Sequence, residues 1–177
     1  MKAPRPNPGR RRSPTPPGAL LRGLFAGSGG TAAMTAYQEL VQSSQDRGPS
    51  TEPQSDAERW QHAPAPAQVA KRILEGIFHE DVSAAHIPLL TNAMHWLYGT
   101  SLGALYGLVQ GTIRANPLAA GLAFGSGAWA LSYAQLVPMG IYEPPWRYPP
   151  KTLAVDLSYH LVYGVGVAGT YAAADLL

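Results

Sequence analysis

Four glycines recur at every fourth position within one uncharged run of this chain. The run HWLYGTSLGALYGLVQG begins at His95 and carries Gly99, Gly103, Gly107 and Gly111. Each glycine in a helix interior costs about 1 kcal/mol relative to alanine, so four of them need a compensating contact. Residues four apart share one face of a helix, and two backbones can approach closely at glycine. The spacing therefore predicts a helix whose glycine face packs against another helix.

Three further segments of the chain are long and apolar, and each has a similar face of small residues. These faces comprise Gly23 and Gly27, Gly121 and Gly125, and Gly164 with Ala168 and Ala172. Together with the first run, the segments cover residues 19–41, 89–110, 117–138 and 153–176. Each has the roughly 20 residues that a helix needs to cross a bilayer. Small residues at every fourth position are typical of contacts between membrane helices. The glycines lack the lysine of a phosphate-binding loop, which favours packing as their role.

We therefore predict an all-α fold, an integral membrane four-helix bundle formed by residues 19–177. Residues 1–18, rich in proline and arginine, are predicted to be a disordered basic tail. The segment 42–88 is predicted to be an extramembrane loop containing a short amphipathic helix, which lies on the membrane surface or over the bundle. A soluble helical bundle is the structural alternative. It would need polar outer faces, and residues 115–137 carry few polar side chains.

An internal repeat relates the first and third segments, and the second and fourth. Residues 23–36 and 121–134 are identical at seven of fourteen positions. HWLYG, beginning at His95, matches HLVYG, beginning at His160, and a further tyrosine lies eleven residues after each histidine. The pattern predicts a duplicated helix pair. Because one helix separates each segment from its equivalent, the two copies are predicted to run parallel rather than inverted.

Charge is concentrated at the beginning of the chain. Six of the thirteen lysines and arginines fall within the first 22 residues. Basic residues close to a membrane favour the cytoplasmic side, so the N-terminus, and with an even number of spans the C-terminus, is predicted to be cytoplasmic. The predicted partners are a lipid bilayer and, through the glycine faces, further copies of the chain. Nucleic acid is not predicted, because no aromatic residue is interleaved with the arginines. Cysteine is absent, which excludes disulfides and thiolate metal sites.

The polar residues of the apolar segments are predicted to gather in one layer near one end of the bundle. Helix rise places His95, Asp156 and His160 at a similar depth. Further members of the layer are Gln38, Glu39 and Gln135. Asp156 and His160 are four residues apart and share a helix face, so the carboxylate can orient the imidazole. Three interpretations remain open: a structural hydrogen-bond network, a proton-responsive or ligand site, and a zinc or iron site.

The segments HWLYG, PPWRYP and DLSYHLVYGVG resemble the YagU-like family of small bacterial inner-membrane proteins of unknown function. The resemblance covers the last three apolar segments. It implies a multi-spanning inner-membrane protein linked with acid tolerance, and it carries no catalytic residue to transfer. The chain departs from the family pattern in its long arginine-proline tail and its short C-terminus.

Three classes of function follow from these observations. The first is a structural or stress-related membrane protein, and the second is a component of a transporter or channel that acts as an oligomer. The third is an intramembrane metal-dependent enzyme, which ranks last because no nucleophile lies beside a base. No catalytic residue and no cofactor are predicted.

Overall fold

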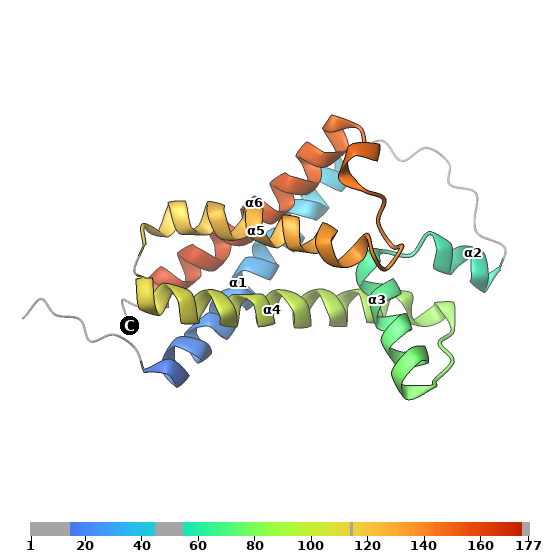
Figure 1. The fold of residues 1–177 in the computed structure, drawn as a ribbon, viewed down its shortest axis with the longest axis horizontal. Helices are drawn as coiled ribbons and strands as arrows, with labels where there is room; N and C mark the ends of the chain where they lie inside the picture. The colour runs from blue at the N-terminus through green and yellow to red at the C-terminus, as the bar shows by residue number, and fades with distance from the viewer. Residues whose placement is uncertain (1–14, 45–54, 114, 175–177) are drawn as a thin grey trace, which may run out of the picture.

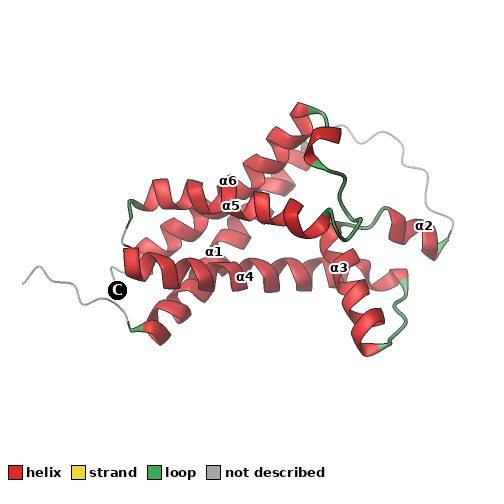
Figure 2. Ribbon diagram, viewed as in Figure 1, coloured by secondary structure: helices red, strands yellow, loops and turns green. Residues whose placement is uncertain are grey.

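The computed structural model describes residues 15–44, 55–113 and 115–174, and these residues form helices without any strand (Figure 2). The four long helices are α1 (Pro16–Ser43), α4 (Ile87–Ile113), α5 (Pro117–Leu136) and α6 (Pro150–Ala174). The shorter elements are α2 (Asp56–Gln61), α3 (Ala65–Ile73), a π-helical turn (Leu74–Phe78), and two 3-10 turns (Ala84–His86 and Pro145–Arg147). The prediction of an all-α fold is confirmed for the described residues.

Proline and a capping side chain define where two of the long helices begin. Thr15 accepts a hydrogen bond from the backbone N–H of Gly18, at 3.4 Å, before α1, and Asn116 accepts one from Ala119, at 3.1 Å, before α5. Proline follows each cap at a position where its missing N–H costs nothing. Helix α1 therefore begins inside the segment 1–18 that we expected to be a tail. Residues 1–14 of that segment lie outside the described part of the chain.

The four long helices pack in the order α4, α1, α6 and α5, and the first and last of these do not close into a ring. Helix α1 packs against both α4 and α6, and α5 packs against α6, whereas α4 and α5 have little direct contact. In Figure 1, α1 and α6 run diagonally across the direction of α4 and α5. Helices α1 and α4 are antiparallel, because Gly27 meets Gly99 while Gly23 meets Gly103, and α5 and α6 are antiparallel, because Gly121 meets Gly164 while Gly125 meets His160. The series leaves space between α4 and α5 that side chains have to bridge.

Glycine-to-glycine contact joins the helices of this series. A methyl group added at Gly103 would lie 2.5 Å from the backbone nitrogen of Gly27, and one added at Gly23 would lie 2.8 Å from Cα of Ala104. The α5–α6 pair has the same kind of contact, since a methyl group at Gly164 would lie 2.6 Å from the nitrogen of Gly125. No side chain fits in either gap, so the backbones themselves are in contact.

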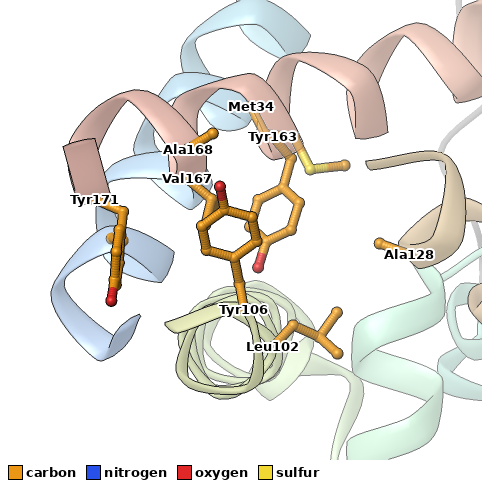
Figure 3. Close-up of a cluster of buried hydrophobic side chains, with 9 residues drawn as sticks. Met34, Leu102, Tyr106, Ala128, Tyr163, Val167, Ala168 and Tyr171 are labelled. Carbon is orange, nitrogen blue, oxygen red and sulfur yellow. The ribbon is translucent and has the colours of Figure 1, made fainter. Parts of the chain in front are cut away.

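Aromatic side chains fill the core beside these backbone contacts (Figure 3). The Tyr163 hydroxyl donates a hydrogen bond to the carbonyl of Gly99 at 2.6 Å, and it thereby joins α6 to α4. The rings of Tyr106 and Phe124 lie 5.0 Å apart and bridge α4 and α5. Val167 is fully buried against Gly30 of α1. One end of the α4–α5 space is therefore packed, and the other end remains open for the cavity described below.

The prediction of an integral membrane bundle is wrong. Among residues 15–44, 55–113 and 115–174, the structure contains no helix that combines the length and the hydrophobicity required for a membrane span. This finding also overturns the predicted multi-spanning membrane function, the transporter, channel and intramembrane-enzyme alternatives, and the inner-membrane location with cytoplasmic termini. The physical reason is that a segment with few charged residues does not have to be strongly hydrophobic. Helix α1, for example, contains Arg22, Ser28, Thr35 and Glu39 between its apolar residues.

The segment 42–88 contains more structure than the single amphipathic helix that we predicted. Ala67 and Ala70 of α3 are buried, and the Trp60 indole of α2 donates a hydrogen bond to the Val82 carbonyl at 3.2 Å. The helical period changes at the π-helical turn, which rotates later side chains away from the face of α3. Phe78 is consequently exposed rather than part of one continuous apolar face.

The glycine contacts predict opposite effects for the same substitution at two helix positions. Gly103→Ala should lower the free energy of unfolding by about 1–3 kcal/mol, because the new methyl group displaces a packed backbone. Gly127→Ala should raise it by about 0.5–1 kcal/mol, because nothing lies within 4 Å of its added methyl group and the unfolded chain loses freedom. Urea denaturation of both variants measures the difference, and equal effects would contradict the contact.

Candidate functional site

A cavity of about 530 Å³ occupies the open end of the space between α4 and α5. Helices α1 and α6 form its inner wall, and the first residues of α3 close one side. Most of its surface is apolar and includes Met34, Met94, Leu102, Leu136 and Met139. All three methionines in the part of the chain that the structure describes therefore line this cavity. Methionine is flexible and polarisable, so such a wall can adapt to ligands of different shape.

Asp156 is the single carboxylate in the cavity lining, and its two oxygens have different surroundings. Oδ2 accepts hydrogen bonds from the indole N–H of Trp129, at 3.0 Å, and from the hydroxyl of Tyr133, at 3.1 Å. Oδ1 lies 3.8 Å from Nδ1 of His160. The Asp156 side chain is 23% exposed, so water or a ligand can reach it. Two neutral donors thus hold one carboxylate oxygen, and the other remains available.

The tautomer of neutral His160 follows from its contact with the backbone. Nδ1 lies 2.9 Å from the carbonyl oxygen of Asp156, and a carbonyl can only accept a hydrogen bond. Nδ1 therefore carries the proton, and Nε2 of the neutral ring is an acceptor. Within the described residues, no group donates a hydrogen bond to Nε2. His160 lines the cavity, so its ring is accessible to a ligand there.

His95 lies in the same cavity, close enough to His160 that a charge on one ring disfavours a charge on the other. Its Nε2 is 3.3 Å from Oγ1 of Thr35 on α1. Burial lowers the pKa of His95, and the nearby His160 lowers it further. The structure thus places both histidines of the repeated HxxYG pattern on one cavity, from α4 and α6. His95 is neutral at pH 7 because its pKa lies below the ordinary value of 6.5.

The tyrosines around Asp156 are affected both by burial and by its carboxylate. Burial raises the pKa of Tyr142 to about 12, and the charge of Asp156 contributes to this shift. The pKa of Tyr133 is also raised, first by burial and then by Asp156, to which its hydroxyl is hydrogen-bonded. These phenols stay protonated at neutral pH and remain hydrogen-bond donors. The field in this part of the cavity is therefore negative.

The remaining residues of the predicted polar layer divide into two groups. Gln38 and Gln135 line the cavity, and Gln135 accepts a hydrogen bond from the Tyr98 hydroxyl at 2.8 Å. Glu39 is exposed and is not part of the cavity lining. The glycines predicted to pack helices lie at helix contacts, including Gly107 against Gly23 and Gly121 against Gly164. Gly111 is half-buried in the last turn of α4.

Sequence analysis missed two partners of the polar residues. Trp129 was not assigned to the site, although it lies one turn before Tyr133 and both side chains donate to Asp156. Their four-residue spacing was a usable signal, because it places two N–H or O–H donors on one helix face. Thr35, the neighbour of His95, had no comparable signal because serines and threonines are frequent along α1.

The interpretation as a zinc or iron site receives no support from the geometry. In the part of the chain that the structure describes, no three histidine, aspartate or glutamate side chains lie close enough together to bind a metal ion. Asp156 Oδ2 is already occupied by two donors, and Nδ1 of His160 is protonated. The ligand and structural interpretations of the layer remain.

The lowered pKa of His95 predicts that acid weakens the fold. Below pH 6.5 the unfolded chain binds a proton at this position more readily than the folded protein does. Stability should therefore be complete above 6.5 and fall as the pH drops from 6.5 toward the lowered pKa. His95→Gln should make the free energy of unfolding less dependent on pH over this window. The exposed His86 provides the control, and equal pH slopes for His95→Gln and His86→Gln would contradict the assignment.

Comparison with known proteins finds no matching family model, no similar curated protein and no similar solved structure. The resemblance to the YagU-like family therefore stays a prediction from the sequence. The functional assignment below depends on the cavity and its side chains alone.

Proposed function

We propose that this protein binds a small organic molecule in the cavity between α4 and α5. The observation that carries the proposal is a space of about 530 Å³ whose apolar lining surrounds a few polar groups. Binding sites for small molecules are typically concave, mostly apolar, and about 300–1,000 Å³ in volume. A core that had evolved only for stability would fill such a space, because unfilled volume costs free energy.

The polar groups give the ligand a defined orientation. Asp156 and His160 lie together on α6, whereas the methionines and Leu102 supply apolar contact. An apolar body with one polar end fits this division of the lining. Its polar end replaces the water that the carboxylate would otherwise need. The proposed role is binding rather than catalysis, because the Ser132 hydroxyl donates to the Trp129 carbonyl and no base lies beside it.

We infer further that the four long helices arose as a duplicated helix pair, with α1 equivalent to α5 and α4 equivalent to α6. The contacts that support this are glycine pairs in both halves and two tyrosine bonds from α6 to α4, whose matching order means that these two helices are parallel, as equivalent helices would be. Tyr163 donates to the Gly99 carbonyl and Tyr171 donates to the Gly107 carbonyl, eight residues further along each helix. Under this equivalence the two halves supply one histidine each to the cavity.

The experiment uses an apolar alcohol as the probe and the cavity methionines as reporters. Phenylbutanol should shift the methyl NMR signals of Met34, Met94 and Met139, assigned by single Met→Leu substitutions. Ala128 lies buried in the cavity lining on α5, so Ala128→Leu should fill part of the space and weaken binding about tenfold or more.

Ala130→Leu is the matched control, because Ala130 is exposed on the same helix. It should leave phenylbutanol affinity unchanged. The proposal would be overturned if no methionine signal moved with phenylbutanol, or if Ala128→Leu and Ala130→Leu had the same affinity as the wild-type protein.

A further inference from the structure

The charges around the cavity are unbalanced. Its lining contains the carboxylate of Asp156 and the imidazoles of His95 and His160, but no lysine or arginine. His95 is neutral at pH 7, since burial and His160 lower its pKa. Arg72 donates to the carbonyl of Met139 at the edge of the cavity, but its guanidinium is not part of the lining. Inside the cavity the Asp156 carboxylate therefore produces a negative potential, which is strengthened by the low dielectric of the apolar walls.

The carboxylate also lacks a full set of hydrogen bonds. Trp129 and Tyr133 both donate to Oδ2. Over residues 15–44, 55–113 and 115–174, no side chain or backbone N–H donates to Oδ1. The one charged group that can pair with it there is His160, at 3.8 Å, and the Nδ1 proton of that ring is directed to the Asp156 carbonyl at 2.9 Å. A partly buried carboxylate without a cationic partner is costly unless something else compensates its charge.

The open positions on Asp156 and His160 are both acceptors. Oδ1 of the carboxylate accepts hydrogen bonds, and so does Nε2 of the neutral His160 ring. A fully complementary ligand group therefore donates hydrogen bonds to both acceptors and carries a positive charge that pairs with the carboxylate. A hydroxyl satisfies only the first requirement, and a carboxylate satisfies neither. Hydrogen bonds between charged partners are about twice as strong as neutral ones, which makes a protonated amine the best match.

We propose that the ligand is an amine, an apolar molecule with one protonated nitrogen that binds between Asp156 and His160. This proposal rests on the proposed function, because it assigns the chemical class of the molecule in the same cavity. The apolar body lies among Met34, Met94 and Leu136, which line the cavity. A negative charge on Asp156 favours the protonated form of a nitrogen bound beside it.

Three probes with one carbon skeleton test the charge of the ligand. Dissociation constants are measured for phenylbutylamine, phenylbutanol and phenylbutyrate with the full-length wild-type protein at neutral pH. The amine should bind about tenfold or more tightly than the alcohol, and the acid should bind most weakly. This order needs no variant, so it stands even if a substitution at Asp156 prevents folding.

Two matched substitutions locate the charge that is responsible. Asp156→Asn keeps the shape of the side chain and should remove the preference for the amine, measured as the ratio of the dissociation constants of the alcohol and the amine for the same variant. Glu39→Gln removes an exposed carboxylate outside the cavity and should leave the preference intact. A preference lost equally in both variants would indicate general attraction by the surface rather than a bond to Asp156.

The outcomes separate this proposal from the proposed function. If none of the three probes binds, the cavity is not a ligand site and both proposals fail. If the alcohol binds as tightly as the amine, or the acid binds most tightly, the cavity binds small molecules and the assignment of an amine is wrong. Retention of the full amine preference in Asp156→Asn would also overturn it.

Discussion

Backbone contact at glycine is the interaction on which the rest of this structure depends. Gly23 and Gly27 bring α1 against α4, and Gly121 and Gly125 bring α5 against α6. Each contact replaces side-chain packing with direct approach of two main chains, which fixes the distance between the helices. The cost of about 1 kcal/mol per glycine in a helix is offset there by van der Waals contact. Because α4 and α5 are not joined in this way, the bundle stays open between them.

The space between α4 and α5 explains how a charged carboxylate can lie among apolar side chains inside the bundle. Tyr106 and Phe124 fill one end of the α4–α5 space, and the cavity occupies the other end, where the hydrogen-bonded Tyr98 and Gln135 form part of its lining. The cavity leaves the Asp156 carboxylate accessible within an interior that would otherwise be too apolar for its charge. A carboxylate persists in such a place because two donors hold one oxygen and the cavity leaves the other accessible. The arrangement of the helices therefore produces both the cavity and the exposed carboxylate within it.

Sequence patterns predicted the features of the fold that depend on local spacing. The length of the apolar runs and the spacing of their small residues located the long helices to within a few residues, as for α4, expected at 89–110 and observed at Ile87–Ile113. The proximity of Asp156 and His160 likewise followed from a separation of four residues. Whether the helices span a membrane was harder to predict. A nearly uncharged run with many glycines, alanines and threonines resembles a membrane span when only its charge is considered. The cavity also could not be predicted, since it depends on how far α4 and α5 diverge and on where α3 packs.

The bundle uses different residues for its framework and for most of its cavity wall. At the glycine contacts between α1 and α4 even a methyl group cannot be accommodated, so evolution has almost no freedom there. At Met94, Leu136 and Met139 the lining depends only on side chains, which can change in size or polarity while the helices stay in place. The helix arrangement is therefore difficult to change by substitution, whereas the ligand specificity of the cavity can change. Related chains could thus diverge in what they bind while keeping one arrangement of helices, and the same separation offers a route to redesigning the cavity.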